Sequence, residues 1–338
     1  MRALVYTEPR AVELREWPDP SPATGEVLIE VRAAAICGSD LHGFLGHSRI
    51  RVPPMVMGHE FAGEIVALSP EVVDLAIGDR VVVQPLVSCG RCSQCRAGKP
   101  NICPYRRLMG GQLQGAFAER IAAPQHLVYT IPEGIGYGEA ALTEPLANGV
   151  HMVHLAQAAF QDVVVIGAGT LGLMALQAFR AGGARRLVVV DTAPNRLQVA
   201  AQLGADATVN PALENVDEMV RATFDGGLPS VVVEAVGHTI TRRQALGLVA
   251  PGGSVILLGL AEAVSPLDLL SAINREVRLQ GSYGSDDRDF REALALIAGQ
   301  RVDVSSWVQR FSLDQGQQIF TQLVEDPRNL VKAVFVRE

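Results

Sequence analysis

Residues 161–205 restrict the possible fold more than any other part of the chain. They read QDVVVIGAGTLGLMALQAFRAGGARRLVVVDTAPNRLQVAAQLGA, in which an apolar run, a glycine turn, a helical pattern, a second apolar run and a second helical pattern follow one another. Later apolar runs occur in SVVVEAVG, GGSVILLG and REVRLQGSYG, each preceded by a helical or loop stretch. Strands that alternate with helices in this way predict a parallel, doubly wound α/β sheet.

The glycine turn carries the motif G-x-G-x-x-G, made by Gly167, Gly169 and Gly172 with Thr170 and Leu171 before the last glycine. The first glycine permits a tight turn, the second lets a pyrophosphate approach the backbone, and the third lets helix and strand pack closely. Because the motif follows an apolar run and opens a helical pattern, we expect these five residues to bind a dinucleotide. The alternative is a domain of the same fold that binds another ligand or none.

The second apolar run ends at Asp191, nineteen residues after the last glycine of the motif. A carboxylate at this position accepts hydrogen bonds from the adenosine ribose hydroxyls and repels a 2′-phosphate, so it favours NAD over NADP. Arg196 lies five residues further on. It is interpreted here as an arginine at the start of a helix, near the adenine or ribose, because a phosphate site would not keep Asp191 beside it.

Four of the five cysteines lie within fifteen residues, in a segment with the pattern C-x2-C-x2-C-x7-C that comprises Cys89, Cys92, Cys95 and Cys103. The segment contains Gly90, Gly98 and Pro100 and has no apolar periodicity, so it predicts a loop. Four thiolates satisfy tetrahedral zinc and leave no position for water, which is typical of a structural site. Two disulfides or an iron–sulfur cluster are the alternatives. Disulfides fit poorly with an odd cysteine count and a start that does not resemble a secretory signal.

The fifth cysteine, Cys37, has polar neighbours with ligand chemistry. Ser39, Asp40 and His42 follow within five residues, and two further segments are GHEFAGEIV, with His59 and Glu60, and LTEPLANGVH, with Glu144. One thiolate, one imidazole and one carboxylate would bind zinc with a position left for substrate. The residues alone leave this second site open, because a lone cysteine is more often a small buried apolar side chain.

Taken together in this order, the cysteine loop, the distant ligands and the glycine motif resemble the zinc-dependent medium-chain alcohol dehydrogenases over nearly the whole chain. The EPL segment is most similar to the polyol (sorbitol-type), butanediol and threonine dehydrogenase branch. The resemblance implies an α/β protein with a GroES-like, β-rich catalytic domain in two chain segments and a Rossmann domain. We expect catalytic segments at 1–147 and 283–338, a zinc lobe at about 85–110, and the nucleotide domain at 148–282.

Position by position, the resemblance implies a catalytic zinc held by Cys37 and His59. Glu60 and Glu144 match the two carboxylates that bind the metal directly or alternate with water. Which of these two binds in the resting state stays open at this point.

Three further residues match positions around that metal. Asp40 matches the carboxylate that orients His59. Ser39 matches the hydroxyl that hydrogen-bonds the substrate oxygen, and His42 matches the surface end of a proton relay. Zinc would act as a Lewis acid on the alcohol oxygen, and the hydride would pass to the nicotinamide ring.

Two sets of residues concern the substrate. His47, Arg49 and Arg51 lie in the loop before the GHE segment and are interpreted as solvated charges, with an anionic or sugar-phosphate substrate as the alternative. Phe44 and Phe117 are candidates for the wall of the substrate pocket.

The function expected from these observations is NAD-dependent oxidation of a secondary alcohol or polyol to a ketone, with two zinc ions per chain. The alternatives are an L-threonine 3-dehydrogenase, a sugar-phosphate or polyol-phosphate dehydrogenase and, from another class, a non-catalytic NAD-binding redox sensor. The formal charge of −7 and the lack of a basic stripe argue against a nucleic-acid partner, and the absence of an apolar run of about twenty residues argues against a membrane-spanning helix. We expect a cytoplasmic homo-oligomer, a dimer or a tetramer, that acts on a small alcohol.

Overall fold

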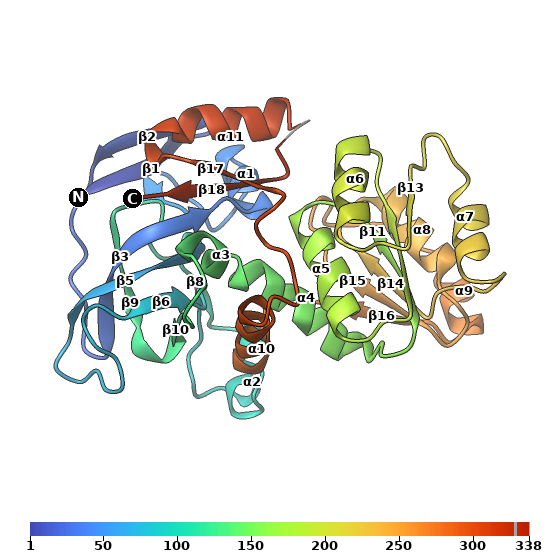
Figure 1. Ribbon diagram of the computed structural model, residues 1–338, viewed down its shortest axis with the longest axis horizontal. Helices are drawn as coiled ribbons and strands as arrows, with labels where there is room; N and C mark the ends of the chain where they lie inside the picture. The colour runs from blue at the N-terminus through green and yellow to red at the C-terminus, as the bar shows by residue number, and fades with distance from the viewer. Residues whose placement is uncertain (328–329, 338) are drawn as a thin grey trace. The chain divides into compact units, whose positions relative to one another are not determined.

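The computed structural model describes residues 1–327 and 330–337, and the chain divides into two compact units. The first unit contains Met1–Glu144, Asp286–Gln300 and the chain from Val304 on, and the second contains Pro145–Ser285 and Arg301–Asp303 (Figure 1). Within the described ranges, no helix combines the length and the apolar composition needed to cross a membrane.

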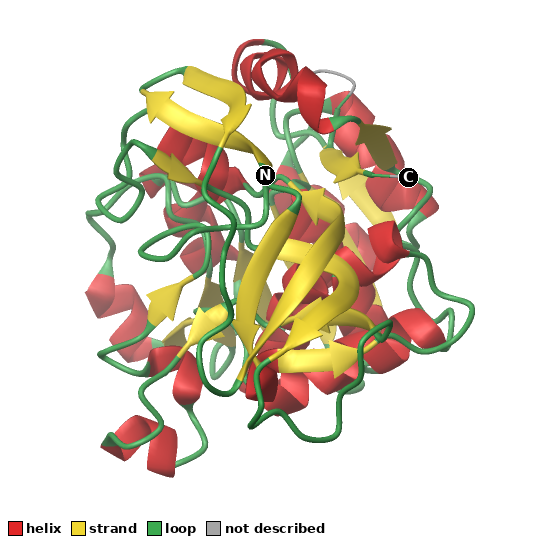
Figure 2. Cartoon of the chain, turned by 90° about the vertical axis from the view of Figure 1, so that its left-hand side faces the viewer, coloured by secondary structure: helices red, strands yellow, loops and turns green. Residues whose placement is uncertain are grey.

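The first unit is built on mostly antiparallel sheets, whose long twisted strands cross the middle of Figure 2. The largest sheet has the order β10-β6-β5-β3-β18-β17, and β9 also pairs with β3. Its strands are β3 (Glu26–Ala35), β5 (Glu60–Leu68), β6 (Arg80–Val83), β9 (Arg120–Pro124), β10 (Val128–Thr130), β17 (Val308–Phe311) and β18 (Lys332–Val336). A smaller sheet joins β1 (Arg2–Glu8), β2 (Ala11–Glu16) and β4 (Met55–Val56), and a two-stranded sheet joins β7 (Leu86–Val87) and β8 (Arg107–Leu108).

The helices of the first unit are short, apart from α10 and α11. They are α1 (Gly38–Phe44), α2 (Ser93–Arg96), α3 (Tyr137–Ala141), α10 (Asp287–Ala298) and α11 (Gly316–Glu325), with 3-10 turns η1 (Pro100–Ile102), η2 (Gln125–Leu127) and η3 (Leu313–Gln315). Helix α4 (Thr143–Ala156) begins in this unit and continues into the second.

The chain returns to the first unit through β18, which pairs antiparallel with β3 so that Val334 faces Ala35 and Val336 faces Ala33. On its other side, β3 pairs with β5, and Ala35 faces Glu60. The ends of three strands from distant parts of the sequence therefore lie next to one another. This arrangement places residues near 36, 60 and 332 close together.

The second unit contains the parallel sheet that the sequence predicts. Its order is β13-β12-β11-β14-β15-β16, and all its pairs are parallel. The strands are β11 (Asp162–Ile166), β12 (Arg186–Val190), β13 (Ala207–Val209), β14 (Val231–Glu234), β15 (Ser254–Leu257) and β16 (Arg278–Gly281). The helices are α5 (Thr170–Ala181), α6 (Pro194–Gln202), α7 (Val216–Thr223), α8 (Thr239–Leu248) and α9 (Leu269–Asn274). Strands β11 and β14 are buried at every position, as expected for a sheet covered on both faces.

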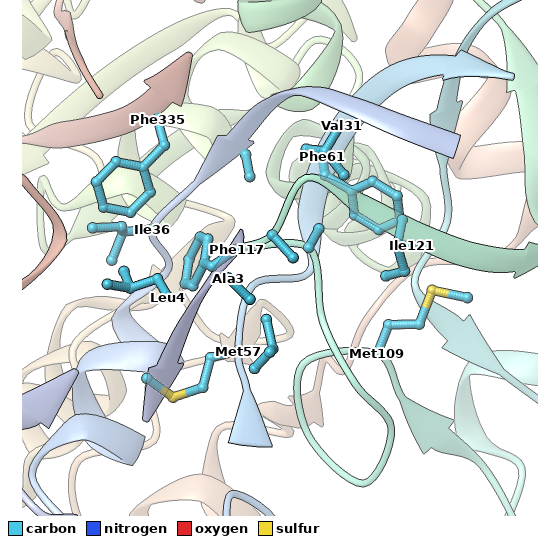
Figure 3. Close-up of a cluster of buried hydrophobic side chains, with 14 of the residues drawn as sticks. Ala3, Leu4, Val31, Ile36, Met57, Phe61, Met109, Phe117, Ile121 and Phe335 are labelled. Carbon is cyan, nitrogen blue, oxygen red and sulfur yellow. The ribbon is translucent and has the colours of Figure 1, made fainter. Parts of the chain in front are cut away.

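The core of the first unit is drawn in Figure 3 and includes the rings of Phe117 and Phe335. The Phe117 ring centroid lies 5.4 Å from that of Phe335 and 5.9 Å from that of Phe320, and Phe44 lies 5.1 Å from Phe320. Phe44 and Phe117 are each only 1% exposed. Their interpretation as walls of a substrate pocket was therefore wrong: both rings fill the space between the sheets and α11.

Truncation of Phe117 tests this correction. Phe117→Ala should lower the free energy of unfolding by about 3–5 kcal/mol, because it removes a buried ring and leaves a cavity. Phe160→Ala is the matched control, since the same change at a ring that is 83% exposed should shift stability by less than about 0.5 kcal/mol. Denaturant unfolding measures both. A change in substrate preference without loss of stability would restore the pocket interpretation.

Candidate functional site

The sulfur atoms of the four clustered cysteines lie close together in the loop that connects β7 to β8. The Sγ–Sγ distances are 3.5 Å for Cys92–Cys95 and Cys89–Cys103, 3.8 Å for Cys92–Cys103 and 4.0 Å for Cys89–Cys95. A tetrahedron of thiolates about 2.3 Å from a zinc ion has edges of about 3.8 Å. A disulfide needs an S–S distance of about 2.05 Å, and all four cysteines are free. The sulfur positions therefore fit a closed zinc site and exclude the disulfide alternative.

The pKa values of these thiols show why a cation suits the site. The N–H of Arg91 and, against some desolvation, the N–H of Cys92 lower the pKa of Cys89 to about 6. For Cys92 the N–H of Cys95 favours the thiolate, but burial and the sulfur atoms of its neighbours outweigh it and raise the pKa to about 11. Desolvation also opposes ionisation of Cys95, but hydrogen bonds with Cys92 and Ser88 outweigh it and lower the pKa of that thiol. The loop thus favours thiolates at Cys89 and Cys95 and resists one at Cys92. A divalent cation at the centre removes that resistance.

A second group of ligand atoms comes from Cys37, His59 and Glu60, which lie within 4.8 Å of one another. Cys37 is the N-cap of α1 and follows β3, whereas Glu60 begins β5, the strand beside β3. The sheet register therefore brings together residues that are more than twenty positions apart. One thiolate, one imidazole and one carboxylate are a donor set that suits catalytic zinc.

The carboxylate of Asp40 contacts two members of this group, Cys37 and His59. Its Oδ2 accepts a hydrogen bond from the N–H of Cys37 at 3.0 Å, and its Oδ1 lies 3.3 Å from Nδ1 of His59. Asp40 is fully buried, which by itself would raise its pKa, but the charges of His59 and Arg51 outweigh burial and lower the pKa to about 2. Because Nδ1 of His59 faces this carboxylate, Nε2 is left as the ligand atom.

Glu60 is paired with a lysine that the sequence analysis missed. Nζ of Lys332 lies 2.5 Å from Oε2 of Glu60 and 2.8 Å from the carbonyl oxygen of Ile36, and both charged side chains are fully buried. Oε1 of Glu60 is buried with no hydrogen-bond partner among the residues that the structure describes. An orphaned carboxylate oxygen beside a thiol and an imidazole is explained by a cation ligand. The signal for Lys332 was a single charge inside the apolar strand VKAVFV.

Arg51 differs from its prediction as a solvated charge. Its side chain is only 3% exposed, and Nη2 lies 3.0 Å from both Asp40 Oδ1 and Ser39 Oγ. The neighbouring His47 and Arg49 are exposed, as expected. Arg51 is therefore part of the site rather than of the surface.

His42 and Glu144 are the remaining predicted residues of the proton relay and of the catalytic metal site. His42 is exposed in α1, with its ring 5.2 Å from that of His47. Partial burial, together with the charges of His47 and Arg51, lowers the pKa of His42. Glu144 lies in the first turn of α4 and does not belong to the group formed by the thiol of Cys37 and its two partners.

The glycine turn of the second unit has the geometry that a pyrophosphate requires. Gly167 has φ +98°, and a Cβ there would meet Val236 at 2.6 Å. A Cβ on Gly172 would lie 1.7 Å from the carbonyl oxygen of Gly167, whereas a Cβ on Gly169 would meet nothing within 4 Å. The first and third glycines are therefore required by packing, and the second leaves open space. Helix α5 begins at Thr170 directly after it, so its N-terminal N–H groups face that space.

Asp191 braces the same turn. Its Oδ2 accepts a hydrogen bond from the N–H of Ala168 at 2.7 Å, and its Oδ1 accepts one from Ala193 at 2.8 Å. Nη1 of Arg196 lies 4.0 Å from Oδ2 of Asp191. Each carboxylate oxygen retains a lone pair for a ribose hydroxyl.

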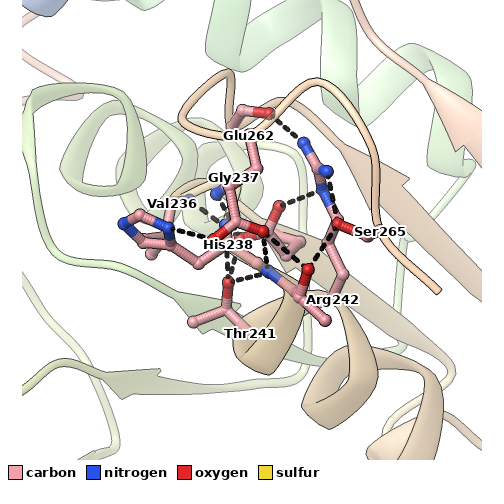
Figure 4. A network of polar contacts seen from close by, with 10 residues as sticks. Val236, Gly237, His238, Thr241, Arg242, Glu262 and Ser265 are labelled. Carbon is pink, nitrogen blue, oxygen red and sulfur yellow. Dashed lines mark hydrogen bonds and ion pairs between the residues drawn. The ribbon is translucent and has the colours of Figure 1, made fainter. Parts of the chain in front are cut away.

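A polar network that the sequence analysis did not predict occupies the carboxyl ends of β14 and β15 (Figure 4). Buried Glu234 accepts hydrogen bonds from the N–H of Gly237 at 2.7 Å and from the Thr241 hydroxyl at 2.8 Å. Glu262 accepts one from the Thr239 hydroxyl at 2.6 Å and lies 3.0 Å from Nδ1 of His238. The hydrogen bonds from Thr239 and His238 lower the pKa of Glu262 to about 2. The network fixes two loops at the sheet edge where parallel sheets bind ligands.

Comparison with known proteins places these sites in a family. The family model described as Alcohol dehydrogenase GroES-like domain matches residues 23–133, and the one described as Zinc-binding dehydrogenase matches residues 170–299. An uncharacterized zinc-type alcohol dehydrogenase-like protein of Escherichia coli K12, YdjJ, is 36% identical over 326 residues, which are 93% of this chain and 92% of that one. The sorbitol dehydrogenase of Bacillus subtilis is 33% identical over 99% of this chain and 96% of its own. An L-threonine 3-dehydrogenase of Saccharopolyspora erythraea is 33% identical over 90% of both.

Solved structures of dehydrogenases have the same fold as this chain. An E. coli oxidoreductase/dehydrogenase of unknown specificity involved in membrane biogenesis has a TM-score of 0.94 and 33% identity, with 99% of this chain and 98% of that chain covered. An E. coli alcohol dehydrogenase complexed with NADH has a TM-score of 0.93 and 27% identity, with 100% and 99% covered. A Sinorhizobium meliloti 1021 protein bound to NADP has a TM-score of 0.92 and 30% identity, with 99% of both chains covered. The predicted pair of GroES-like and Rossmann domains is confirmed, and the chain belongs to the zinc-binding alcohol dehydrogenase family.

Proposed function

We propose that this protein oxidises a secondary alcohol or a polyol to a ketone with NAD⁺, reversibly. The observation that carries the proposal is the group formed by Cys37, His59 and Glu60, with the carboxylate of Asp40 behind it. The sorbitol dehydrogenase relative supports a polyol as the substrate class. A metal site with one open position can bind and polarise the oxygen of an alcohol.

Cys37 and His59 hold the catalytic zinc in this proposal, and Glu60 and Glu144 are its two carboxylates. Glu60 is favoured in the resting state because its buried Oε1 has no other partner in the described part of the chain. When bound, zinc supplies a Lewis acid that polarises the alcohol oxygen. Bound NAD⁺ would supply the acceptor for the hydride of the carbinol carbon, and the alcohol proton would leave separately.

The proton passes through this chain's own residues. The Ser39 hydroxyl lies two positions after Cys37 and takes the proton from the substrate oxygen. His42 delivers it to solvent, since its side chain is exposed and its lowered pKa keeps the imidazole neutral and able to accept. Asp40 acts as the partner that orients His59.

The structural zinc is assigned to the four clustered cysteines, whose sulfur atoms have tetrahedral spacing. The cofactor is assigned to the turn of Gly167, Gly169 and Gly172 with Thr170 and Leu171. Asp191 favours NAD over NADP, because its carboxylate repels a 2′-phosphate. Arg196 lies beside that carboxylate, at the start of α6, and borders the adenosine.

We assign residues 1–147 and 283–338 to the catalytic domain, with a zinc lobe at about 85–110, and residues 148–282 to the NAD domain. The protein is proposed to be a cytoplasmic homo-oligomer, a dimer or a tetramer. Two observations support self-association: every residue of edge strand β16 is exposed, and apolar side chains of α9 and the loop after β16 face solvent in the monomer, namely Leu269, Leu270, Ile273 and Tyr283. An exposed edge strand with apolar side chains beside it is a surface for pairing with a second copy.

L-threonine 3-dehydrogenase is the second candidate, because a relative with that activity is 33% identical over 90% of this chain. A sugar-phosphate or polyol-phosphate substrate has less support, because Arg51 is buried against Asp40 rather than free for a phosphate. A non-catalytic NAD-binding sensor would not need the intact ligand group.

A substrate panel with metal analysis tests the proposal. The purified protein should contain two zinc ions per chain and reduce NAD⁺ with polyols, diols or secondary alcohols, measured by NADH absorbance. Faster turnover of L-threonine or of a polyol phosphate would select those alternatives. One zinc and no turnover on any substrate would leave only an NAD-binding protein.

The two zinc sites should respond differently to loss of a ligand. Cys37→Ala should lose one zinc and nearly all turnover while the melting temperature changes little. Cys95→Ala should lose the other zinc and lower the melting temperature first, because a closed zinc site contributes folding free energy. Elemental analysis, calorimetry and turnover separate these outcomes. Equal loss of activity at unchanged stability in both variants would contradict the assignment.

Asp191→Asn tests the choice of cofactor. The change keeps the side-chain shape but removes the charge, so kcat/KM for NAD⁺ should fall about tenfold, while the preference for NAD⁺ over NADP⁺ should fall on the order of a hundredfold. Asp217→Asn, at an exposed carboxylate in α7, is the control and should change neither value. An unchanged cofactor preference would show that Asp191 only braces the glycine turn.

A further inference from the structure

Arg51 is buried deeply for a charged residue that lies in a surface loop. Its side chain is 3% exposed, and a buried guanidinium is costly unless it is paired. It forms an ion pair with Asp40 and a hydrogen bond with the Ser39 hydroxyl, and both use the same atom, Nη2. Nε is buried and has no partner in the described ranges. The contacts that the guanidinium makes with Ser39, Asp40 and His59 therefore all come from Nη2, which faces the site.

The surrounding chain is shaped to hold Arg51 there. A Cβ on Gly43 would lie 2.3 Å from Cδ of Arg51, so α1 leaves a groove for the arginine stem. The backbone N–H groups of Ile50 and Arg51 both donate to the hydroxyl of Ser48 at 3.3 Å, which fixes the turn that directs the side chain inward. Helix and loop together place one cation beside Asp40.

The chemistry of a guanidinium sets the direction of every hydrogen bond it makes. Arginine only donates, so Oγ of Ser39 accepts from Arg51 and its own hydrogen must point elsewhere. Oδ1 of Asp40 accepts from the same nitrogen and faces Nδ1 of His59 at 3.3 Å. Nη2 is also 3.5 Å from that ring nitrogen, so the three groups meet at one point. One cation thereby connects the relay hydroxyl to the carboxylate that orients a metal ligand.

We propose that Arg51 is a positioning residue that fixes the Ser39 hydroxyl and the Asp40 carboxylate as one unit. This inference rests on the proposed function for its relay half. The alcohol O–H proton passes to Oγ of Ser39 as the hydroxyl hydrogen of Ser39 moves on towards His42, and the hydride reduces NAD⁺ to NADH. Arg51 occupies one lone pair of Oγ and gives up no proton, so the other lone pair receives the incoming proton. Through Asp40, the same cation holds His59 in its ligand orientation.

The test compares Arg51→Met with Arg49→Met in the zinc-loaded enzyme. Methionine keeps an apolar stem in the groove of α1, and Arg49 is an exposed neighbour in the same loop. Titration with a chromogenic zinc chelator should remove the more weakly held zinc from Arg51→Met at a chelator concentration about 10-fold to 100-fold lower than from the wild type, as outer ligand partners typically require. Arg49→Met should titrate like the wild type.

Turnover gives the second readout. In Arg51→Met, kcat should fall about 10-fold to 100-fold with a smaller change in KM, and the solvent deuterium isotope effect on kcat should rise, because proton transfer becomes limiting. In a Ser39→Ala background, Arg51→Met should lower kcat little further, since residues that act as one unit are not additive. If the methionine variant does not fold, Arg51→Lys replaces it, because lysine keeps the positive charge but lacks the planar guanidinium with its several N–H donors. Arg51→Lys should retain zinc better than Arg51→Met but should still raise the isotope effect.

Two outcomes would overturn the inference. Either the Arg51 variants hold zinc as the wild type does and show its isotope effect, or the kcat losses of Arg51→Met and Ser39→Ala multiply independently. If the wild type oxidises no alcohol, the proposed function fails, and the chelator titration alone then decides whether Arg51 holds the metal group through Asp40.

Discussion

The first unit depends on a balance of buried charges at the ends of three neighbouring strands. Asp40 and Glu60 are carboxylates with no exposed surface, and each is matched by one buried cation, Arg51 and Lys332 respectively. Unpaired, either carboxylate would be costly to bury. Beside these pairs, the thiol of Cys37 and the unpartnered Oε1 of Glu60 are donor atoms that suit a cation. In the proposed function, a divalent ion held here would make the local charge more positive, which would favour negative charge on a substrate oxygen.

The topology of the sheet makes this balance possible. Strand β3 lies between β5 and β18, so a residue near 60 and a residue near 332 reach the same point beside the end of β3. Lys332 also donates to the carbonyl oxygen of Ile36, the residue before Cys37, and so ties the last strand to the turn that carries the thiol. The return of the chain to the first unit therefore supplies a charge to the site as well as a strand to the sheet.

The features that the sequence predicted are those encoded by neighbouring residues. The glycine turn and the four-cysteine loop each fit within fifteen residues, and the spacing of the glycines and cysteines predicts which atoms lie close together. Arg51 and Lys332 could not be placed, because their partners are set by strand register and by a glycine groove that no local pattern reveals. Phe44 and Phe117 were misplaced for the same reason: an aromatic near a predicted site can face either the ligand or the core, and only packing decides.

The capping interaction of Asp40 at the start of α1 has several consequences for this site. As the third residue of α1 its carboxylate accepts the N–H of Cys37, an ordinary capping interaction that fixes the helix start. The second oxygen of the same carboxylate is thereby aimed at His59 and Arg51. The cap fixes the carboxylate of Asp40, and the carboxylate in turn fixes the orientation of the His59 imidazole and of the Arg51 guanidinium. The guanidinium then fixes the hydroxyl of Ser39. The geometry of the proposed relay is therefore set by a helix cap, which forms as soon as α1 folds and needs no substrate to organise it.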